Sequence, residues 1–264
     1  MIHRRRDGLD DYYRLMVAEG LWTTEPRLRL YTEFLFRGVP LAGRSVLDIG
    51  GGTGVFSFFA AANGASRVVC LEPDGAGSTK AQTAKFARVA QALGRQDVML
   101  APQTLQEFDS GGLTFDVVLM LNSVNNIDEL SCVNLTISEL AARNYQQIFF
   151  RLAQLVTEEG CLILEDCSPR NLYPLLGLKN PLARSIEWHK HQPPEVWIGL
   201  LQDSGFADPE VRWTTFNCLG RGGRVLLSNR FAAFFLKSNF CLRMKRAQAQ
   251  LGQGEPFPPA PGGS

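Results

Sequence analysis

The order of apolar and amphipathic segments predicts an α/β protein with a doubly wound, seven-stranded, mostly parallel sheet and an N-terminal helical cap. Three observations lead to this prediction. The apolar run 45–49 enters a glycine-rich turn and is followed by a helical pattern. The run 115–121 is continuous and apolar, as a strand buried on both faces should be. The 264 residues are enough for one sizeable core.

Hydrophobic spacing places the elements in order. Strands are expected at 45–49, 67–72, 98–101, 115–121, 161–165, 210–216 and 239–245. Helices are expected at 55–63, 78–93, 136–156, 194–204 and 223–235, with Ser78 as a candidate N-cap. Glu159-Gly160 is expected to form a turn, and 168–194 to be irregular.

Composition shifts suggest three parts of the chain. Residues 1–40 form the helical cap, with a helical pattern over 8–37 that Gly20 breaks in two. Residues 41–246 form the main α/β domain. Residues 247–264 are rich in proline and glycine, cannot bury a core, and are expected to be disordered.

Composition also narrows the functional class. Hydrophobic residues make up 45% of the chain, and the net charge is +1, which is no electrostatic footprint for nucleic acid. No apolar run approaches the roughly 18 residues that cross a bilayer, and the start lacks a signal-peptide pattern. The six cysteines form no C-x-x-C pair. We therefore expect a cytoplasmic protein, monomeric or homodimeric, that acts on a small molecule and contacts neither nucleic acid nor membrane.

The glycine turn predicts a cofactor site. Its glycines are Gly50, Gly52 and Gly54, with Asp48 two residues before the first and Glu72 closing the next strand. A dinucleotide fingerprint reads G-x-G-x-x-G, because a pyrophosphate rests on the helix that follows. Here the spacing is one residue tighter, and an acid at position 48 would repel a pyrophosphate. It suits the cationic amino group of a methionine moiety.

The stretch Val46-Leu47-Asp48-Ile49-Gly-x-Gly-x-Gly, with an acid after the second strand, resembles the first motif of the class I S-adenosylmethionine-dependent methyltransferases. The resemblance covers roughly residues 41–246 and is strongest over 45–72. It implies S-adenosylmethionine as the cofactor, Glu72 as the ribose anchor, and helices over residues 1–40 that cover the cofactor.

Two further residues are candidates for cofactor contact. Many members of that family place an acid after the third strand for the adenine amino group, whereas this chain has Gln103, which would contact adenine or face solvent. Asn122 follows the fourth strand, where ligands of doubly wound sheets lie. Asparagine and serine at 122–126 are alternatively helix caps, and Asp128 and Glu129 suit a first helical turn.

The candidate catalytic residues follow the fifth strand. The segment 186–194 holds His189 and His191, and a histidine has the right pKa to accept a proton from a reacting hydroxyl. Glu165 and Asp166 close the fifth strand, and their carboxylates are expected either to orient one of these histidines or to bind a substrate hydroxyl. A metal held by the histidines with Glu187 or Asp166 is an alternative, as is simple packing of the loop; we predict no metal.

The sequence thus predicts an enzyme that methylates a small-molecule or saccharide-like acceptor, with a hydroxyl as the expected nucleophile. The chain lacks the Asp/Asn-Pro-Pro-aromatic pattern of the methyltransferases that modify nucleic-acid amino groups. Two alternatives remain at this stage: a nicotinamide-dependent oxidoreductase, and a scaffold protein that binds the cofactor without catalysis.

Overall fold

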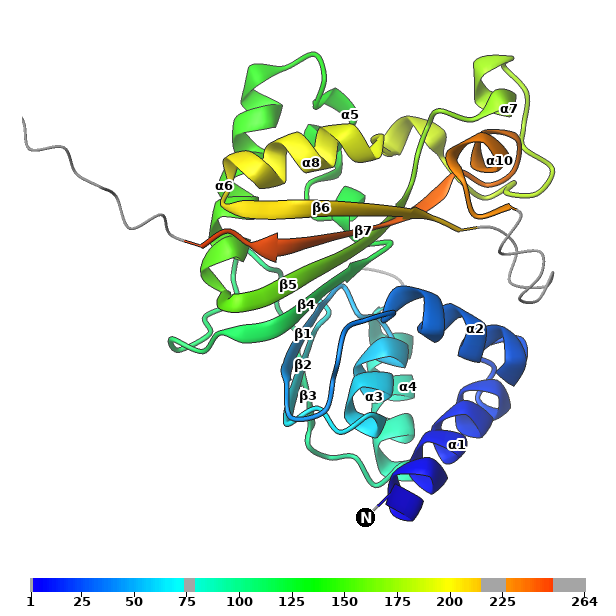
Figure 1. The fold of residues 1–264 in the computed structure, drawn as a ribbon, viewed down its shortest axis with the longest axis vertical. Coiled ribbons are helices and arrows are strands. Elements are labelled where there is room, and N and C mark those ends of the chain that lie inside the picture. Colours follow the sequence, from blue (N-terminus) through cyan, green and yellow to red (C-terminus); the bar gives the residue numbers. More distant parts are fainter. Residues whose placement is uncertain (1, 74–78, 215–226, 249–264) are drawn as a thin grey trace, which may run out of the picture.

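The computed structural model describes residues 2–73, 79–214 and 227–248. Its centre is a seven-stranded sheet with strand order β3-β2-β1-β4-β5-β7-β6 (Figure 1). All neighbouring pairs are parallel except those of β7, which runs antiparallel to both β5 and β6. The strands are β1 (Ser45–Ile49), β2 (Arg67–Leu71), β3 (Val98–Ala101), β4 (Phe115–Leu121), β5 (Val156–Cys167), β6 (Phe206–Trp213) and β7 (Asn239–Arg246).

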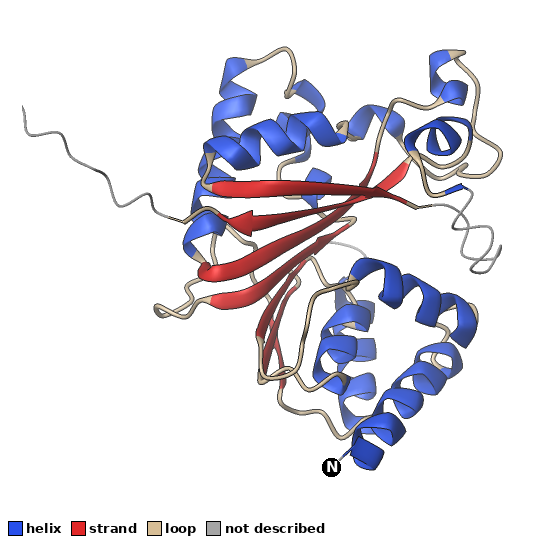
Figure 2. Cartoon of the chain, viewed as in Figure 1, coloured by secondary structure: helices blue, strands red, loops and turns tan. Residues whose placement is uncertain are grey.

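Helices cover both faces of this sheet (Figure 2). On one face lie α1 (Ile2–Ala18), α2 (Glu25–Leu35), α3 (Val55–Ala62) and α4 (Thr79–Ala92). On the other lie α5 (Glu129–Asn134), α6 (Glu139–Gln154) and α8 (Pro194–Asp203), while α7 (Leu172–Leu175) and α10 (Arg230–Phe235) are side by side near the ends of β6 and β7. Single 3₁₀ turns form η1 (Val124–Asn126) and η2 (Trp188–Lys190). The doubly wound fold predicted from the sequence is confirmed.

Strand alternation divides the interior into two hydrophobic layers. In β1, Val46 belongs to the layer beneath α1–α4, together with Phe58 of α3. Its neighbour Leu47 belongs to the layer beneath α6 and α8, together with Phe149 and Trp197. Successive side chains of a strand point to opposite faces, so an apolar run buries both. This is why the parallel strands could be recognised as continuous apolar segments.

The N-terminal helices are attached to the edge of the sheet where the parallel strands end. The hydroxyl of Tyr12 in α1 donates to the carbonyl of Val55, the first residue of α3, at 3.0 Å. The hydroxyl of Tyr31 in α2 donates to the Glu165 carboxylate near the end of β5. Gly20 separates the two helices with φ of 67°, as predicted. The cap is therefore held by polar contacts to the residue that follows the glycine turn and to the end of β5.

Several elements differ from the sequence-based expectations: β6 begins at Phe206 and not at 210, and α7 forms within the stretch 168–194 that was expected to be irregular. The predicted turn at Glu159-Gly160 is wrong, because β5 begins at Val156 and runs through this point. The β4–β5 register shifts between Phe115 and Val117, which indicates a bulge, and a Cβ at Gly160 would lie 2.6 Å from Val156. A bulge absorbs the turn residues without ending the strand. The helix α5 was not predicted as a separate element.

Several expectations fall outside the described residues. They are the cap at Ser78, the end of the strand expected at 210–216, the start of the helix expected at 223–235, and most of the tail after 247. No helix in the described ranges is long and apolar enough to cross a membrane.

Candidate active site

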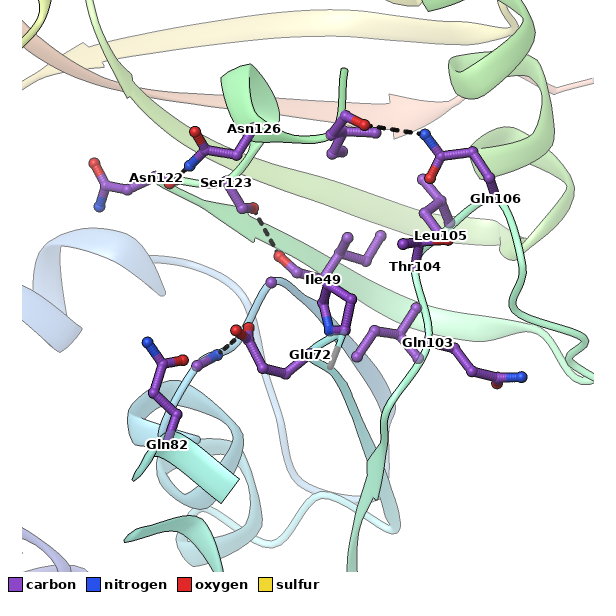
Figure 3. Close-up of a pocket in the computed structure, with 15 residues that line it drawn as sticks. Ile49, Glu72, Gln82, Gln103, Thr104, Leu105, Gln106, Asn122, Ser123 and Asn126 are labelled. Carbon is purple, nitrogen blue, oxygen red and sulfur yellow. Dashed lines mark hydrogen bonds between the residues drawn. The ribbon is translucent and has the colours of Figure 1, made fainter. Parts of the chain in front are cut away.

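A cavity of about 380 Å³ lies beyond the carboxyl ends of β1, β2 and β4 (Figure 3). Its volume is in the range of small-molecule and cofactor sites, and its place is where doubly wound sheets bind ligands. The lining combines an apolar wall with a few polar groups. The residues are Ile49, Gly50, Gly52, Leu71, Glu72, Pro73, Gln82, Gln103, Thr104, Leu105, Gln106, Asn122, Ser123, Asn126 and Ile127.

Two glycines of the turn are required for different reasons. A Cβ at Gly54 would lie 2.6 Å from the ring of Phe86, so this glycine permits close packing of α3 against α4. A Cβ at Gly52 would meet only the Gln82 side-chain oxygen at 3.4 Å, and Gly52 lines the cavity. Both have positive φ, of 79° and 58°, which disfavours L side chains. Gly52 thus keeps the cavity open, whereas Gly54 serves packing.

The polar groups on this wall fit a ligand rich in hydroxyl and amino groups. The Glu72 carboxylate accepts a hydrogen bond from the Gly52 N–H at 2.9 Å, which holds the acid against the turn (Figure 3). The side-chain oxygen of Gln82 is buried and has no hydrogen-bond partner within the described part of the chain. Because a buried unpaired acceptor is costly, this oxygen is available to accept a hydrogen bond from a donor in the cavity.

Asp48 does not line the cavity, contrary to the expectation that it meets the cofactor directly. It is 1% exposed, and the Ser57 hydroxyl donates to it at 2.7 Å. Burial raises the pKa of Asp48 to about 6. A Cβ at Gly51 would lie 2.7 Å from this carboxylate, so Asp48 sits directly beneath the turn. The structure assigns it a supporting position behind the glycines.

The two remaining candidates for cofactor contact, Gln103 and Asn122, both line the cavity. The side chain of Gln103 points away from Glu72 in Figure 3, toward the outside of the site. Asn122 has φ of 55°, and its side-chain N–H group donates to the Glu165 carboxylate at 3.1 Å. Capping of the following helix falls to Asp128, which accepts from the N–H of Ser131 at 2.9 Å. Asn122 therefore does not cap this helix and lines the cavity instead.

Glu165 joins this wall to the N-terminal cap. It is 1% exposed, and the Oε2 that binds Asn122 also accepts the Tyr31 hydroxyl. Burial raises the pKa of Glu165 to about 7, although both hydrogen bonds oppose the rise. Burial also raises the pKa of Tyr31 well above its ordinary value. A residue of α2 therefore helps to hold a residue of the cavity wall in an unusual backbone conformation.

Asp166 and His191 are brought together, as the hypothesis of an oriented histidine requires. Asp166 Oδ1 lies 2.6 Å from His191 Nδ1, and the Asp166 side chain is fully buried. Trp197 Nε1 donates to the other carboxylate oxygen at 3.3 Å. The His191 side chain is 15% exposed, so it lies at the boundary of the interior. His189, the other candidate base, is exposed.

One group of side chains could hold a metal ion. Ligand atoms of Asp166, Cys167 and His191 all lie within 4.8 Å of one another. Burial raises the pKa of the Cys167 thiol far above its ordinary value in the absence of a metal. The metal alternative required both His189 and His191, but this group contains only His191.

Some residues of the site were not found from sequence. Tyr31, Gln82 and the apolar residues Leu105 and Ile127 come from segments with no recognisable motif. Their only sequence signal is position: Leu105 follows the third strand and Ile127 the fourth. Tyr31 is 134 residues away from Glu165, so nothing local indicated the pair.

Comparisons with solved structures give the same fold at low identity. A Listeria monocytogenes protein named as a candidate S-adenosylmethionine-dependent methyltransferase has a TM-score of 0.57 and 12% identity, covering 84% of this chain and 99% of its own. An S-adenosylmethionine-dependent methyltransferase of Mesorhizobium loti has a TM-score of 0.54 and 14% identity, with coverages of 78% and 93%. The protein PH0226 of Pyrococcus horikoshii has a TM-score of 0.55 and 16% identity, with coverages of 84% and 91%.

Comparison with curated protein sequences gives no match. The family described as "Methyltransferase domain" matches residues 23–211, from the segment between α1 and α2 into β6. This match covers well over half of the chain and decides against the oxidoreductase alternative. Together with the glycine turn and the cavity beyond it, the match shows that the chain belongs to the methyltransferase domain family.

Proposed function

We propose that this enzyme transfers the methyl group of S-adenosylmethionine to a hydroxyl group of a small-molecule acceptor, with His191 as the general base. The observation that carries the proposal is the contact between Asp166 and His191 at the carboxyl edge of β5. Leu121 and Glu165 are paired in register, and the Asn122 N–H donates to the Glu165 carbonyl at 2.8 Å. Asp166 therefore lies one residue beyond the strand pair that leads to the cavity wall.

The cavity residues are suited to hold S-adenosylmethionine. Glu72 would accept hydrogen bonds from the ribose hydroxyls, since one carboxylate can accept several. The unpaired Gln82 oxygen would accept from an amino group, and Leu71, Leu105 and Ile127 provide an apolar wall for the adenine. When bound, the cofactor supplies an electrophilic methyl group on a sulfonium. The protein contributes mainly proximity and orientation.

His191 is held in the orientation that a base needs. With Nδ1 donating to Asp166, the hydrogen bond assigns the tautomer in which Nε2 is free to accept a proton. Trp197 and the Cys167 N–H fix the carboxylate in turn. When the imidazole takes the proton of the acceptor hydroxyl, the buried carboxylate stabilises the imidazolium. This is the arrangement of nucleophile, base and orienting acid found in many enzymes.

The test compares two histidine variants in a labelled-methyl assay over a panel of hydroxylated metabolites. His191→Ala should lose about two to four orders of magnitude in turnover, the usual contribution of a positioned base. His189→Ala is the matched control, since this histidine is exposed on the 3₁₀ turn that ends just before His191, and it should retain turnover. Binding of S-adenosylhomocysteine should be unchanged in both. Full turnover of His191→Ala on the true acceptor would remove the base role.

A further inference from the structure

A second cavity, of about 270 Å³, lies at the same edge of the sheet. Ser168, which follows β5, and Trp213, which ends β6, both line it. β5 and β6 each run antiparallel to β7, so their carboxyl ends share the edge that carries the cofactor cavity. Ligands of doubly wound sheets lie beyond this edge. The second cavity is therefore in the position of an acceptor site.

The polar side of this cavity carries excess positive charge. Arg170 and Arg230 both contact the same oxygen, Oε1 of Glu195, at 3.1 Å. One carboxylate cannot neutralise two guanidinium groups, so the three side chains have a net charge of +1. Arginine side chains recognise carboxylates and phosphates through directed pairs of N–H groups. This group is thus suited to bind an oxyanion.

A buried hydroxyl adds a second anion-binding group. Ser168 is fully buried, and its Oγ accepts a hydrogen bond from the Arg170 N–H at 3.3 Å. Among the described residues, nothing accepts the hydroxyl proton of Ser168. A buried hydroxyl that lines a cavity next to two arginines can donate this proton to a ligand oxygen.

The other side of the cavity is apolar. Leu175 of α7, Phe234 of α10 and Trp213 line it. The Trp213 ring packs edge-to-face on buried Phe240, with the ring centroids 5.8 Å apart, so one ring face is positioned by the core. Figure 1 shows α7 and α10 side by side above the end of β6. A ligand with an oxyanion and an apolar or aromatic body would satisfy both sides.

We infer that this cavity is the acceptor subsite and that it takes a small organic acid, held by its carboxylate or phosphate group and by an apolar body. The inference rests on the proposed function. Ser168 is two residues after Asp166, and Glu195 is four residues after His191, so two residues of the cavity lining come from the segments that carry the proposed base and its orienting acid. An acid anchored here would present the rest of the molecule toward His191. The volume restricts the acceptor to a small molecule.

The test measures binding of benzoate, phenylacetate, indole-3-acetate and phenyl phosphate by calorimetry in the presence of S-adenosylhomocysteine. The neutral amide of each carboxylic acid is the matched ligand. At least one acid should bind about tenfold more tightly than its neutral counterpart. Phenyl phosphate separates a preference for phosphate from one for carboxylate. No binding by any of these acids would overturn the inference.

Variants at the charged group give effects of opposite sign. The double variant Arg170→Gln/Arg230→Gln should bind the acid about tenfold more weakly, whereas Glu195→Gln should bind it about fivefold more tightly, because the competing carboxylate is gone. Arg143→Gln is the control, since Arg143 makes a similar exposed pair with Glu139 on α6. Unchanged or weaker binding by Glu195→Gln would contradict the inference.

A separate readout distinguishes the two proposals. S-adenosylhomocysteine should bind equally to the parent and to all these variants, because the cofactor cavity shares no lining residue with the second one. Loss of acid binding with intact S-adenosylhomocysteine binding overturns the acceptor subsite alone. Failure of the parent to bind S-adenosylhomocysteine overturns the proposed function.

Discussion

Glu165 makes the free energy of unfolding depend on pH in a direction opposite to that of an ion-paired acid. Its pKa is raised by burial from 4.5 to about 7 in the folded protein. Between these two pKa values the folded state binds more protons than the unfolded state. The contribution of Glu165 to stability is therefore fully present below pH 4.5 and is lost as the pH rises through 7. Glu165→Gln removes this titration and still offers Tyr31 an oxygen acceptor.

The size of the effect follows from the pKa difference. Between pH 5 and pH 8, Glu165 should account for a loss of about 2.5 kcal/mol in the free energy of unfolding. Asp48, whose pKa burial raises to about 6, should add about 1.5 kcal/mol, mostly below pH 6. The parent should thus lose about 4 kcal/mol in this range and Glu165→Gln only about 1.5 kcal/mol.

Urea unfolding followed by circular dichroism at half-unit steps of pH measures these differences. Glu159→Gln, which changes an exposed carboxyl on the same strand, is the control and should follow the parent. Tyr31→Phe removes a donor to the carboxylate, so its loss of stability should be larger at pH 8 than at pH 5. Parallel profiles for the parent and Glu165→Gln would refute the argument that Glu165 titrates from a buried, uncharged state.

Three further predictions concern the glycine turn, the proposed ribose anchor Glu72 and a helix cap. Gly52→Ala should lower the free energy of unfolding by about 1–2 kcal/mol through its positive φ, and it should abolish S-adenosylhomocysteine binding in calorimetry because its Cβ enters the cavity. Gly54→Ala should lower the free energy of unfolding by about 2–5 kcal/mol, because its Cβ meets the Phe86 ring. Glu72→Ala should weaken S-adenosylhomocysteine binding by about 1–3 kcal/mol while the protein remains folded; unchanged affinity would assign the ribose to another residue. Asp128→Ala should lower thermal stability by about 1 kcal/mol through loss of the α5 cap, with cofactor affinity retained.

Local sequence signals determined the elements that depend on a few neighbouring residues. The strands at 45–49, 98–101 and 115–121 agree with the structure at both ends, because continuous apolar runs bounded by turn residues define a buried parallel strand. The glycine turn and the contact of Glu72 with it also depend on a short stretch of chain, and the turn and Glu72 both line the cavity. The wall of the cavity that carries the proposed cofactor residues therefore followed largely from residues 45–72.

Tertiary structure decided what depends on distant neighbours. The full length of β5 was missed because its first residues are held by pairing across a bulge, so the turn residues 159–160 gave the wrong signal. Asp48 was expected in the cavity, yet the direction of its side chain is set by strand alternation, which places it beneath the turn beside Ser57. The spacing of residues along the chain could determine neither where β5 begins nor on which side of the turn the Asp48 side chain lies.

The candidate catalytic residues show the same limit. His189 and His191 are equivalent in the sequence, but one 3₁₀ turn leaves His189 exposed and brings His191 to Asp166, 25 residues away. The contact of Tyr31 with Glu165 spans 134 residues and arises only when α2 packs over the end of β5. Residue types and their order along the chain determined the fold and the cofactor turn. Long-range packing decided which polar groups meet, because burial and hydrogen bonding are properties of the assembled sheet edge.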